Sequence, residues 1–122
     1  MLNLDTHVLL FALQGRLTRR ERALLTSDTW SISGIVLWEI AKLVEIGRVE
    51  IDLDDPEIVR AISGIHTWPI TLDVCRAIAD LDFRSDPADE LIGATSVVFG
   101  APLVTRDRRL RRSKVVPLAD SS

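Results

Sequence analysis

Short apolar segments alternate with segments that carry helix signals along the whole chain, and this alternation restricts the possible folds more than any other feature. We expect strands at residues 2–4, 30–33, 68–70, 103–105 and 115–118. Parallel neighbours in a sheet require a crossover between them, and a helix usually supplies it. We therefore expect an α/β fold with a mostly parallel central sheet and helices on both of its faces.

Signals for helix starts and ends support this alternation. Thr6 is expected to cap the first helix, and Thr18 with Glu21 has the spacing of a capping box that opens the second. The remaining signals are N-caps at Ser33, Asp55, Thr71 and Asp86, prolines at Pro56 and Pro87, and glycine stops at Gly47 and Gly100. The helix after Thr71 is expected to continue to about residue 81.

Length and composition favour a single domain, residues 1–122, because a chain that is 47% hydrophobic has enough apolar surface for one core. The single cysteine, Cys75, cannot form a disulfide within the chain, and the first residues lack the features of a secretion signal. The apolar stretch at residues 35–46 contains three charged residues, so no membrane span is expected. We therefore expect a cytoplasmic protein.

Four acids stand where an apolar segment meets a turn or a helix: Asp5, Glu39, Asp89 and Asp107. Each also has a simpler explanation. Asp5 and Asp107 are placed to cap a following helix or turn, Asp89 to complete a capping box, and Glu39 to pair with Lys42. However, Asp5 and Asp107 both follow expected strands, at the edge where parallel sheets bind ligands. The four acids are therefore candidates for one shared site.

Carboxylates that share a site repel one another, and a divalent cation removes that cost. Oxygen donors without a cluster of cysteine and histidine suit Mg²⁺ or Mn²⁺ and not zinc. His7 and His66 lack the spacing of metal ligands and are expected to be ordinary side chains, although His7 lies close to Asp5. The sequence also lacks a glycine-rich phosphate loop, a GxSxG elbow and a CxxC motif, which excludes the commonest nucleotide-binding, hydrolase and redox classes.

Four segments together resemble the PIN domain of VapC-type toxins. They are residues 4–10, 32–41, 86–95 and 103–107, which occur in the order of that family and span nearly the whole chain. The resemblance implies an endoribonuclease that depends on Mg²⁺ or Mn²⁺ and is the toxin of a type II toxin-antitoxin system. It further implies an RNA substrate, a VapB-like antitoxin as partner and a homodimer.

The resemblance also assigns roles to individual residues. It makes Asp5, Glu39, Asp89 and Asp107 the catalytic and metal-binding acids, with Thr105 and Thr6 in support and Asp86 as a helix cap. The chain departs from the family at Glu90, where many relatives have arginine, and at Ser96, where alanine is common. These departures concern substrate contacts more than catalysis.

The expected reaction is hydrolysis of an RNA phosphodiester by a metal-activated water, which leaves a 5′-phosphate and a 3′-hydroxyl. Although the net charge is −3, basic residues cluster at residues 16–22 and 106–114. The second cluster is expected to bind either the RNA backbone or an acidic antitoxin segment. Its candidate residues are Arg106, Arg108, Arg109, Arg111 and Arg112.

Three other interpretations stay open at this point. A receiver-like signalling domain has a similar length and acids at strand ends, but the paired acids and the lysine of that pattern do not match here. A catalytically silent PIN-like binding module is the second. The third is a nuclease that cleaves structured DNA, because no feature of the sequence separates the two nucleic acids.

Overall fold

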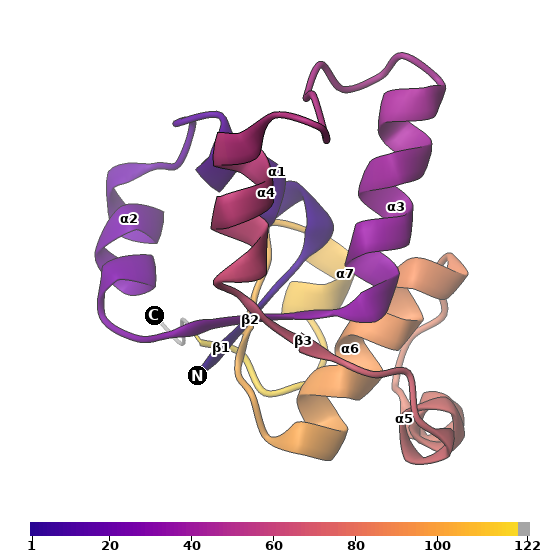
Figure 1. The fold of residues 1–122 in the computed structure, drawn as a ribbon. Helices are drawn as coiled ribbons and strands as arrows, with labels where there is room; N and C mark the ends of the chain where they lie inside the picture. Colours follow the sequence, from indigo (N-terminus) through magenta and orange to yellow (C-terminus); the bar gives the residue numbers. More distant parts are fainter. Residues whose placement is uncertain (120–122) are drawn as a thin grey trace.

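The computed structural model describes residues 1–119, and its centre is a four-stranded sheet in which all neighbouring strands are parallel. β1 (Leu2–Leu4) lies between β2 (Trp30–Ser33) and β4 (Leu103–Val104), and β3 (His66–Trp68) lies at the edge beyond β2 (Figure 1). The predicted parallel α/β fold is therefore confirmed. Residues 120–122 of the expected domain lie outside the described residues.

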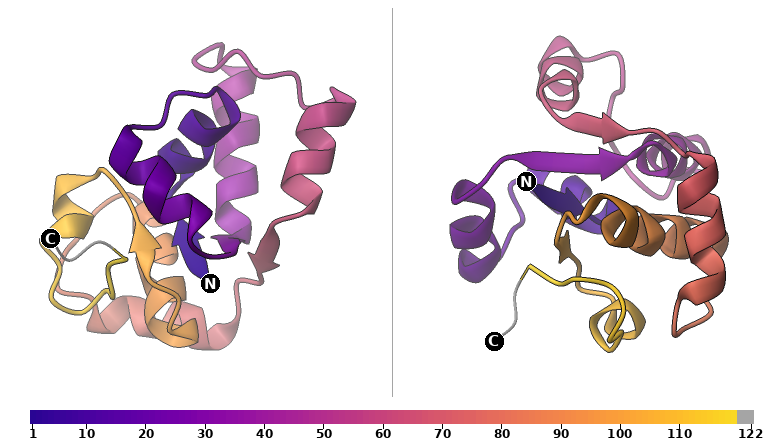
Figure 2. Two further views of the ribbon diagram at one scale, coloured as in Figure 1. Left: turned by 90° about the vertical axis from the view of Figure 1, so that its left-hand side faces the viewer. Right: turned by 90° about the horizontal axis from the view of Figure 1, so that it is seen from below.

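Helices connect the strands and cover both faces of the sheet (Figures 1 and 2). From β1 to β3 the chain crosses the sheet in one direction, and it then returns past β1 to β4. Right-handed crossovers in opposite directions place their helices on opposite faces, so α1 and α4 lie on one face and α5 and α6 on the other. The helices of the described residues are α1 (Thr6–Leu13), α2 (Arg19–Thr26), α3 (Gly34–Glu45), α4 (Pro56–Ser63), α5 (Leu72–Ala77), the 3₁₀ helix η1 (Ile78–Asp80), α6 (Pro87–Phe99) and α7 (Arg108–Arg111).

Most of the predicted helix signals have the expected role. The capping box of Thr18 and Glu21 opens α2, and Gly100 ends α6 with a left-handed φ of 65°. The side chains of Ser33, Asp55, Thr71 and Asp86 each accept a hydrogen bond from a backbone N–H in the first turn of their helix. These caps are local features of the sequence, which is why the sequence predicts them correctly.

Thr6 does not cap α1, contrary to the sequence prediction. Asp5 is the N-cap residue, and its Oδ1 accepts a 2.7 Å hydrogen bond from the backbone N–H of Thr6. Thr6 is instead the first helical residue and is fully buried. An aspartate is as good a cap as a threonine, and the strand ends one residue before it.

Two strand predictions are also wrong. β3 covers residues 66–68 and not 68–70, because Pro69 has no N–H for the sheet and ends the strand. Residues 115–118 form only an isolated bridge from Leu118 to Leu103. The backbone N–H groups of Val115 and Val116 bind the side chain of Ser113 in a turn, so they are not available for a longer ladder.

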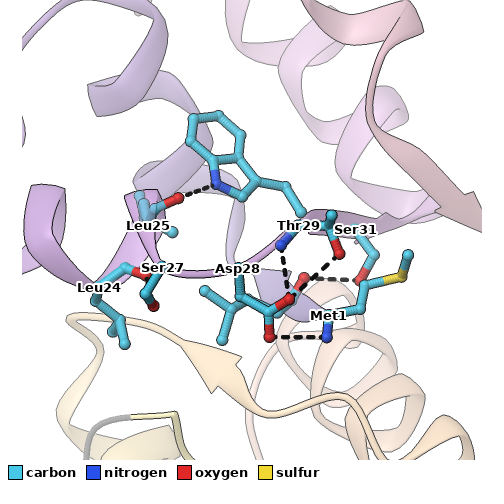
Figure 3. A network of polar contacts seen from close by, with 9 residues as sticks. Met1, Leu24, Leu25, Ser27, Asp28, Thr29 and Ser31 are labelled. Carbon is cyan, nitrogen blue, oxygen red and sulfur yellow. Dashed lines mark hydrogen bonds and ion pairs between the residues drawn. The ribbon is translucent and has the colours of Figure 1, made fainter.

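The amino end of the sheet is held by a network of polar contacts (Figure 3). The amino group of Met1 forms an ion pair of 2.9 Å with Asp28, and the Ser31 hydroxyl donates to the carbonyl of Leu2 at 2.8 Å. The indole N–H of Trp30 binds the carbonyl of Leu25 at 2.7 Å. These contacts fix β1 against β2 at the end of the sheet opposite the four candidate acids.

No helix in the described part of the chain combines the length and the apolar character that a membrane span requires. The core lies between the sheet and its helices, and its fully buried side chains include Leu4, Leu9, Ile32, Ile92 and Leu103. Because these residues come from β1, α1, β2, α6 and β4, the core fixes the strand ends relative to the helices on both faces.

Candidate active site

The carboxyl ends of β1 and β4 lie side by side, at the point where the chain reverses its direction across the sheet. Open parallel sheets bind their ligands at such a switch point. Asp5 follows β1 there, and Asp107 follows β4. Glu39 comes from α3 and Asp89 from α6, and these two helices pack against each other. All four acids line one cleft of about 400 Å³.

Asp5 is the most buried of the four acids, with 4% of its surface exposed. Its Oδ1 accepts the bond from Thr6 that caps α1, and its Oδ2 accepts a 2.6 Å bond from the hydroxyl of Thr105. Burial raises the pKa of Asp5 above its ordinary value, although both hydrogen bonds act in the opposite direction. The charge of Asp107 raises this pKa further.

Thr105 connects Asp5 to Asp107. The backbone N–H of Asp107 donates to the Thr105 hydroxyl oxygen at 3.0 Å, and that hydroxyl donates in turn to Asp5. Oδ1 of Asp107 caps α7 through the N–H groups of Arg109 and Leu110. Asp107 therefore has both roles that the sequence left open, since it caps a helix and also lines the cleft with the other acids.

Glu39 is half-buried and accepts a hydrogen bond from the hydroxyl of Thr6 through Oε1. Burial raises its pKa, and the charges of Asp5 and Asp86 add to this effect. The alternative ion pair with Lys42 does not form, because Lys42 pairs with Glu45 at 3.4 Å. Glu39 thus faces other acids across the cleft.

Asp89 is the third residue of α6, and its N–H donates to Oδ1 of the capping residue Asp86 at 3.0 Å. Its own Oδ2 accepts a 2.8 Å bond from the Ser85 hydroxyl. Burial raises the pKa of Asp89 to about 6, and the charges of Asp86, Asp5 and Asp107 contribute to the increase. Glu90 accepts a bond from the backbone N–H of Ser85 at 3.1 Å, so its carboxylate is held at the start of α6.

The donor set fits a hard divalent cation. The four acids supply oxygen donors, and the pKa values of Asp5, Glu39 and Asp89 are raised chiefly by burial, with a further contribution from the charges of neighbouring acids. Within residues 1–119, no three such side chains are close enough together to hold an ion as they stand. Glu39 and Asp89 are each held beside the cleft by a hydrogen bond from a neighbouring hydroxyl.

The basic cluster at residues 106–114 divides into two groups. Arg106 makes two 2.7 Å bonds to the carboxylate of Glu21 and lies 3.9 Å over the ring of Phe11. Arg109 binds the carbonyl of Arg84, and Arg111 binds that of Thr105. The guanidinium groups of Arg108 and Arg112 have no hydrogen-bonding or ionic partner among residues 1–119. They line a second cleft beside the acids.

Sequence reasoning missed the role of Ser85 and gave Asp86 only that of a helix cap. Ser85 positions Asp89 from beside the cleft, Asp86 adds a fifth carboxylate to it, and the exposed His7, which was expected to lie close to Asp5, lines it as well. The signal for Ser85 was its place directly before the Asp86-Pro87 helix start, where a hydroxyl reaches the third helical residue. Nothing in the sequence brings His7 to Glu39, because that proximity depends on how α1 packs against α3.

A model of the PIN domain family matches residues 3–115. The chain belongs to the PIN domain family. This confirms the resemblance that the four sequence segments carry, and it leaves the receiver-like interpretation without support. Ribonuclease VapC22 of Mycobacterium tuberculosis is 33% identical to this PIN domain over 93 residues, which are 74% of the present chain and 72% of that relative. The PIN domain is therefore of the VapC type.

Solved structures with low sequence identity share the fold of this PIN domain. A toxin-antitoxin complex from Klebsiella pneumoniae has a TM-score of 0.71 at 16% identity and covers 98% of both chains. VapBC2 from Rickettsia felis, bound to a DNA fragment from its promoter, has a TM-score of 0.71 at 18% identity, with 97% of both chains covered. FitAcB from Neisseria gonorrhoeae has a TM-score of 0.65 at 21% identity, with 90% of both chains covered.

Proposed function

We propose that this VapC-type PIN domain is a cytoplasmic, divalent-metal-dependent endoribonuclease and the toxin of a type II toxin-antitoxin system. The observation that carries the proposal is the convergence of Asp5, Glu39, Asp89 and Asp107, from four separate elements, on one cleft at the switch point of the sheet. Collecting like charges in a half-buried cleft is unfavourable without a cation. The ribonuclease VapC22 and the fold of the toxin-antitoxin complexes support the same activity.

Mg²⁺ or Mn²⁺ is the proposed cofactor, with Asp5, Glu39, Asp89 and Asp107 as its protein ligands. When bound, the cation supplies activation of the attacking water and compensation for charge on the phosphate oxygens. The chain itself contributes orientation. Thr105 fixes Asp5, Thr6 fixes Glu39 and Ser85 fixes Asp89, each through a hydroxyl that donates to one carboxylate oxygen.

The partners that we propose are RNA, a VapB-like antitoxin and a second copy of the chain. Arg106, Arg108, Arg109, Arg111 and Arg112 are the proposed contacts for RNA or antitoxin. Arg108 and Arg112 are best suited, because their side chains are exposed and make no other interaction within residues 1–119. Arg106 is least suited, because Glu21 and Phe11 already hold it.

The proposal is tested by incubating purified protein with total RNA and Mn²⁺ or Mg²⁺, with and without a chelator. We expect cleavage that stops when the metal is removed and products that carry 5′-phosphate and 3′-hydroxyl ends. An Asp5→Asn variant is expected to be inactive. Cleavage that continues in the chelator and in this variant contradicts the mechanism, and cleavage of single-stranded DNA at the same rate contradicts the assignment to RNA.

A further inference from the structure

A second cleft of about 650 Å³ begins at the acids and extends away from them between α7 and the loop before α6. It shares Asp86, Asp89 and Asp107 with the acidic cleft. Phe83 and Ser85 belong to its loop wall. Its opposite wall carries the basic residues Arg108, Arg109 and Arg112. The two clefts therefore meet at these shared acids, and the second one adds three guanidinium groups and the carboxylate of Asp82 to its lining.

The walls of this second cleft are held together by hydrogen bonds at two places. The Arg109 guanidinium donates to the carbonyl of Arg84 at 2.8 Å. Farther along, the Ser113 hydroxyl and the Lys114 N–H donate to the carboxylate of Asp82 at 2.5 and 2.8 Å. These bonds connect the segment that contains α7 to the loop before α6. The cleft is thus formed before any ligand arrives, which lowers the entropic cost of binding.

Arg108 and Arg112 are left available by this arrangement. They lie four residues apart and so emerge from the same side of a helical turn. Both are exposed, and neither side chain has a hydrogen-bonding or ionic partner in the described part of the chain. A guanidinium group presents several N–H donors that match the oxygens of a phosphate. Two such groups in a cleft that leads to the acids are suited to successive phosphates of one strand.

We infer that this second cleft binds the backbone of single-stranded RNA on one side of the cleaved bond, with Arg108 and Arg112 as its phosphate contacts. The inference rests on the proposed ribonuclease function and adds a path for the substrate. An RNA strand whose phosphodiester lies at the acids continues beyond them. The second cleft extends the site in a direction where arginines provide positive charge. Phosphate contacts of this kind position a strand without reading its bases.

An acidic protein segment is the competing occupant, since it too is attracted by arginine. The position of the cleft argues against it, because the cleft leads to the acids at which the proposed reaction holds a phosphodiester, and an RNA strand bound there must continue beyond them. A divalent cation held by these acids would bind a phosphate oxygen of the same strand. RNA is therefore the occupant that connects both clefts, and an acidic peptide is the alternative that the test distinguishes.

The test compares an Arg108→Gln/Arg112→Gln variant with an Arg19→Gln/Arg22→Gln control, which removes two exposed arginines from α2. Cleavage of a short single-stranded RNA is followed in Mn²⁺ over a series of salt concentrations. We expect the KM of the cleft variant to rise about tenfold while kcat is retained. We also expect the slope of log KM against log salt concentration to fall by about 1.4, because two phosphate contacts are removed. The control is expected to behave like the parent protein.

Equal KM and salt slopes in the cleft variant and the control overturn the inference while the ribonuclease activity of the parent stands. A parent protein that neither binds nor cleaves the RNA refutes the proposed function itself, and this inference with it. Competition by an oligoglutamate peptide identifies the other occupant. If the cleft variant loses binding of the peptide but retains its KM for RNA, the cleft is a protein-binding surface and the inference is wrong.

Discussion

The hydroxyl of Thr105 donates a 2.6 Å hydrogen bond to Oδ2 of Asp5, across the carboxyl ends of β4 and β1. The two residues are 100 positions apart in the sequence, and both are buried. The same hydroxyl oxygen accepts a bond from the backbone N–H of Asp107. One side chain thereby fixes the relative positions of two candidate ligands.

Replacing Thr105 by valine removes this connection while the shape of the side chain is retained. Buried Asp5 loses a donor and the Asp107 N–H loses its acceptor. The free energy of unfolding, measured by urea titration, should therefore fall by about 1–3 kcal/mol. We expect cleavage to slow by about ten- to a hundredfold, because the orientation of two acids is lost. Thr105→Ser retains the hydroxyl and is the control. If Thr105→Ser loses as much activity as Thr105→Val, loss of the hydrogen bond is not the cause of the slower cleavage.

Asp5→Asn tests whether the acids share a cation. We expect Mn²⁺ to raise the Tm of the parent protein, because an ion that binds only the folded state stabilises it. The rise should be largely lost in Asp5→Asn, since one ligand and one charge are missing. Asp28→Asn is the matched control, because it removes an acid from the opposite end of the sheet and should leave the metal effect intact. Equal increases in Tm for both variants rule out a site at Asp5.

The raised pKa of Asp89 predicts a pH dependence of stability in chelator. Its value of about 6, against an ordinary 3.8, means that the folded state binds the proton more tightly than the unfolded state. The resulting stabilisation is complete at pH values below the ordinary pKa of 3.8 and disappears as the pH rises through about 6. The Tm of the parent should therefore fall relative to the Tm of Asp89→Asn between about pH 4 and 7.

A control for this pH experiment is Asp80→Asn, which removes an exposed acid outside the cleft. Its change in Tm relative to the parent over the same pH range gives the baseline for an acid outside the cleft. The prediction for Asp89 is refuted if the Tm of the parent increases relative to that of Asp89→Asn as the pH rises. Cleavage in Mn²⁺ should increase over this interval, because metal and proton compete for the same carboxylate.

The pair of Arg106 and Glu21 predicts the opposite dependence at lower pH. The hydrogen bond from Arg106 lowers the pKa of Glu21 from 4.5 to about 2. The pair therefore stabilises the protein at pH values above the ordinary pKa of Glu21, and this contribution is lost as the pH falls through about 2. Glu21→Gln should cost about 0.5–1 kcal/mol at neutral pH, because water screens the exposed guanidinium. Glu45→Gln, in the solvated pair with Lys42, should cost less.

Much of the site was predictable from local sequence patterns. Asp5 and Asp107 follow short apolar runs, and Asp86-Pro87 marks the helix that carries Asp89. These signals depend on a few neighbouring residues, so a single sequence contains them in full. The same reasoning failed at residues 115–118, where apolar character predicted a strand but the hydroxyl of Ser113 binds the backbone in a turn.

The chain alone determined the alternation of strands and helices, the caps and the positions of four acids at element ends, because propensity and capping are properties of short segments. Only the tertiary structure decided which groups meet. Glu21 binds Arg106 from 85 positions away and removes it from the set of free arginines, while Arg108 and Arg112 face a cleft. Side chains from distant segments meet only when the strand order and helix packing place them together, and no local pattern contains that information.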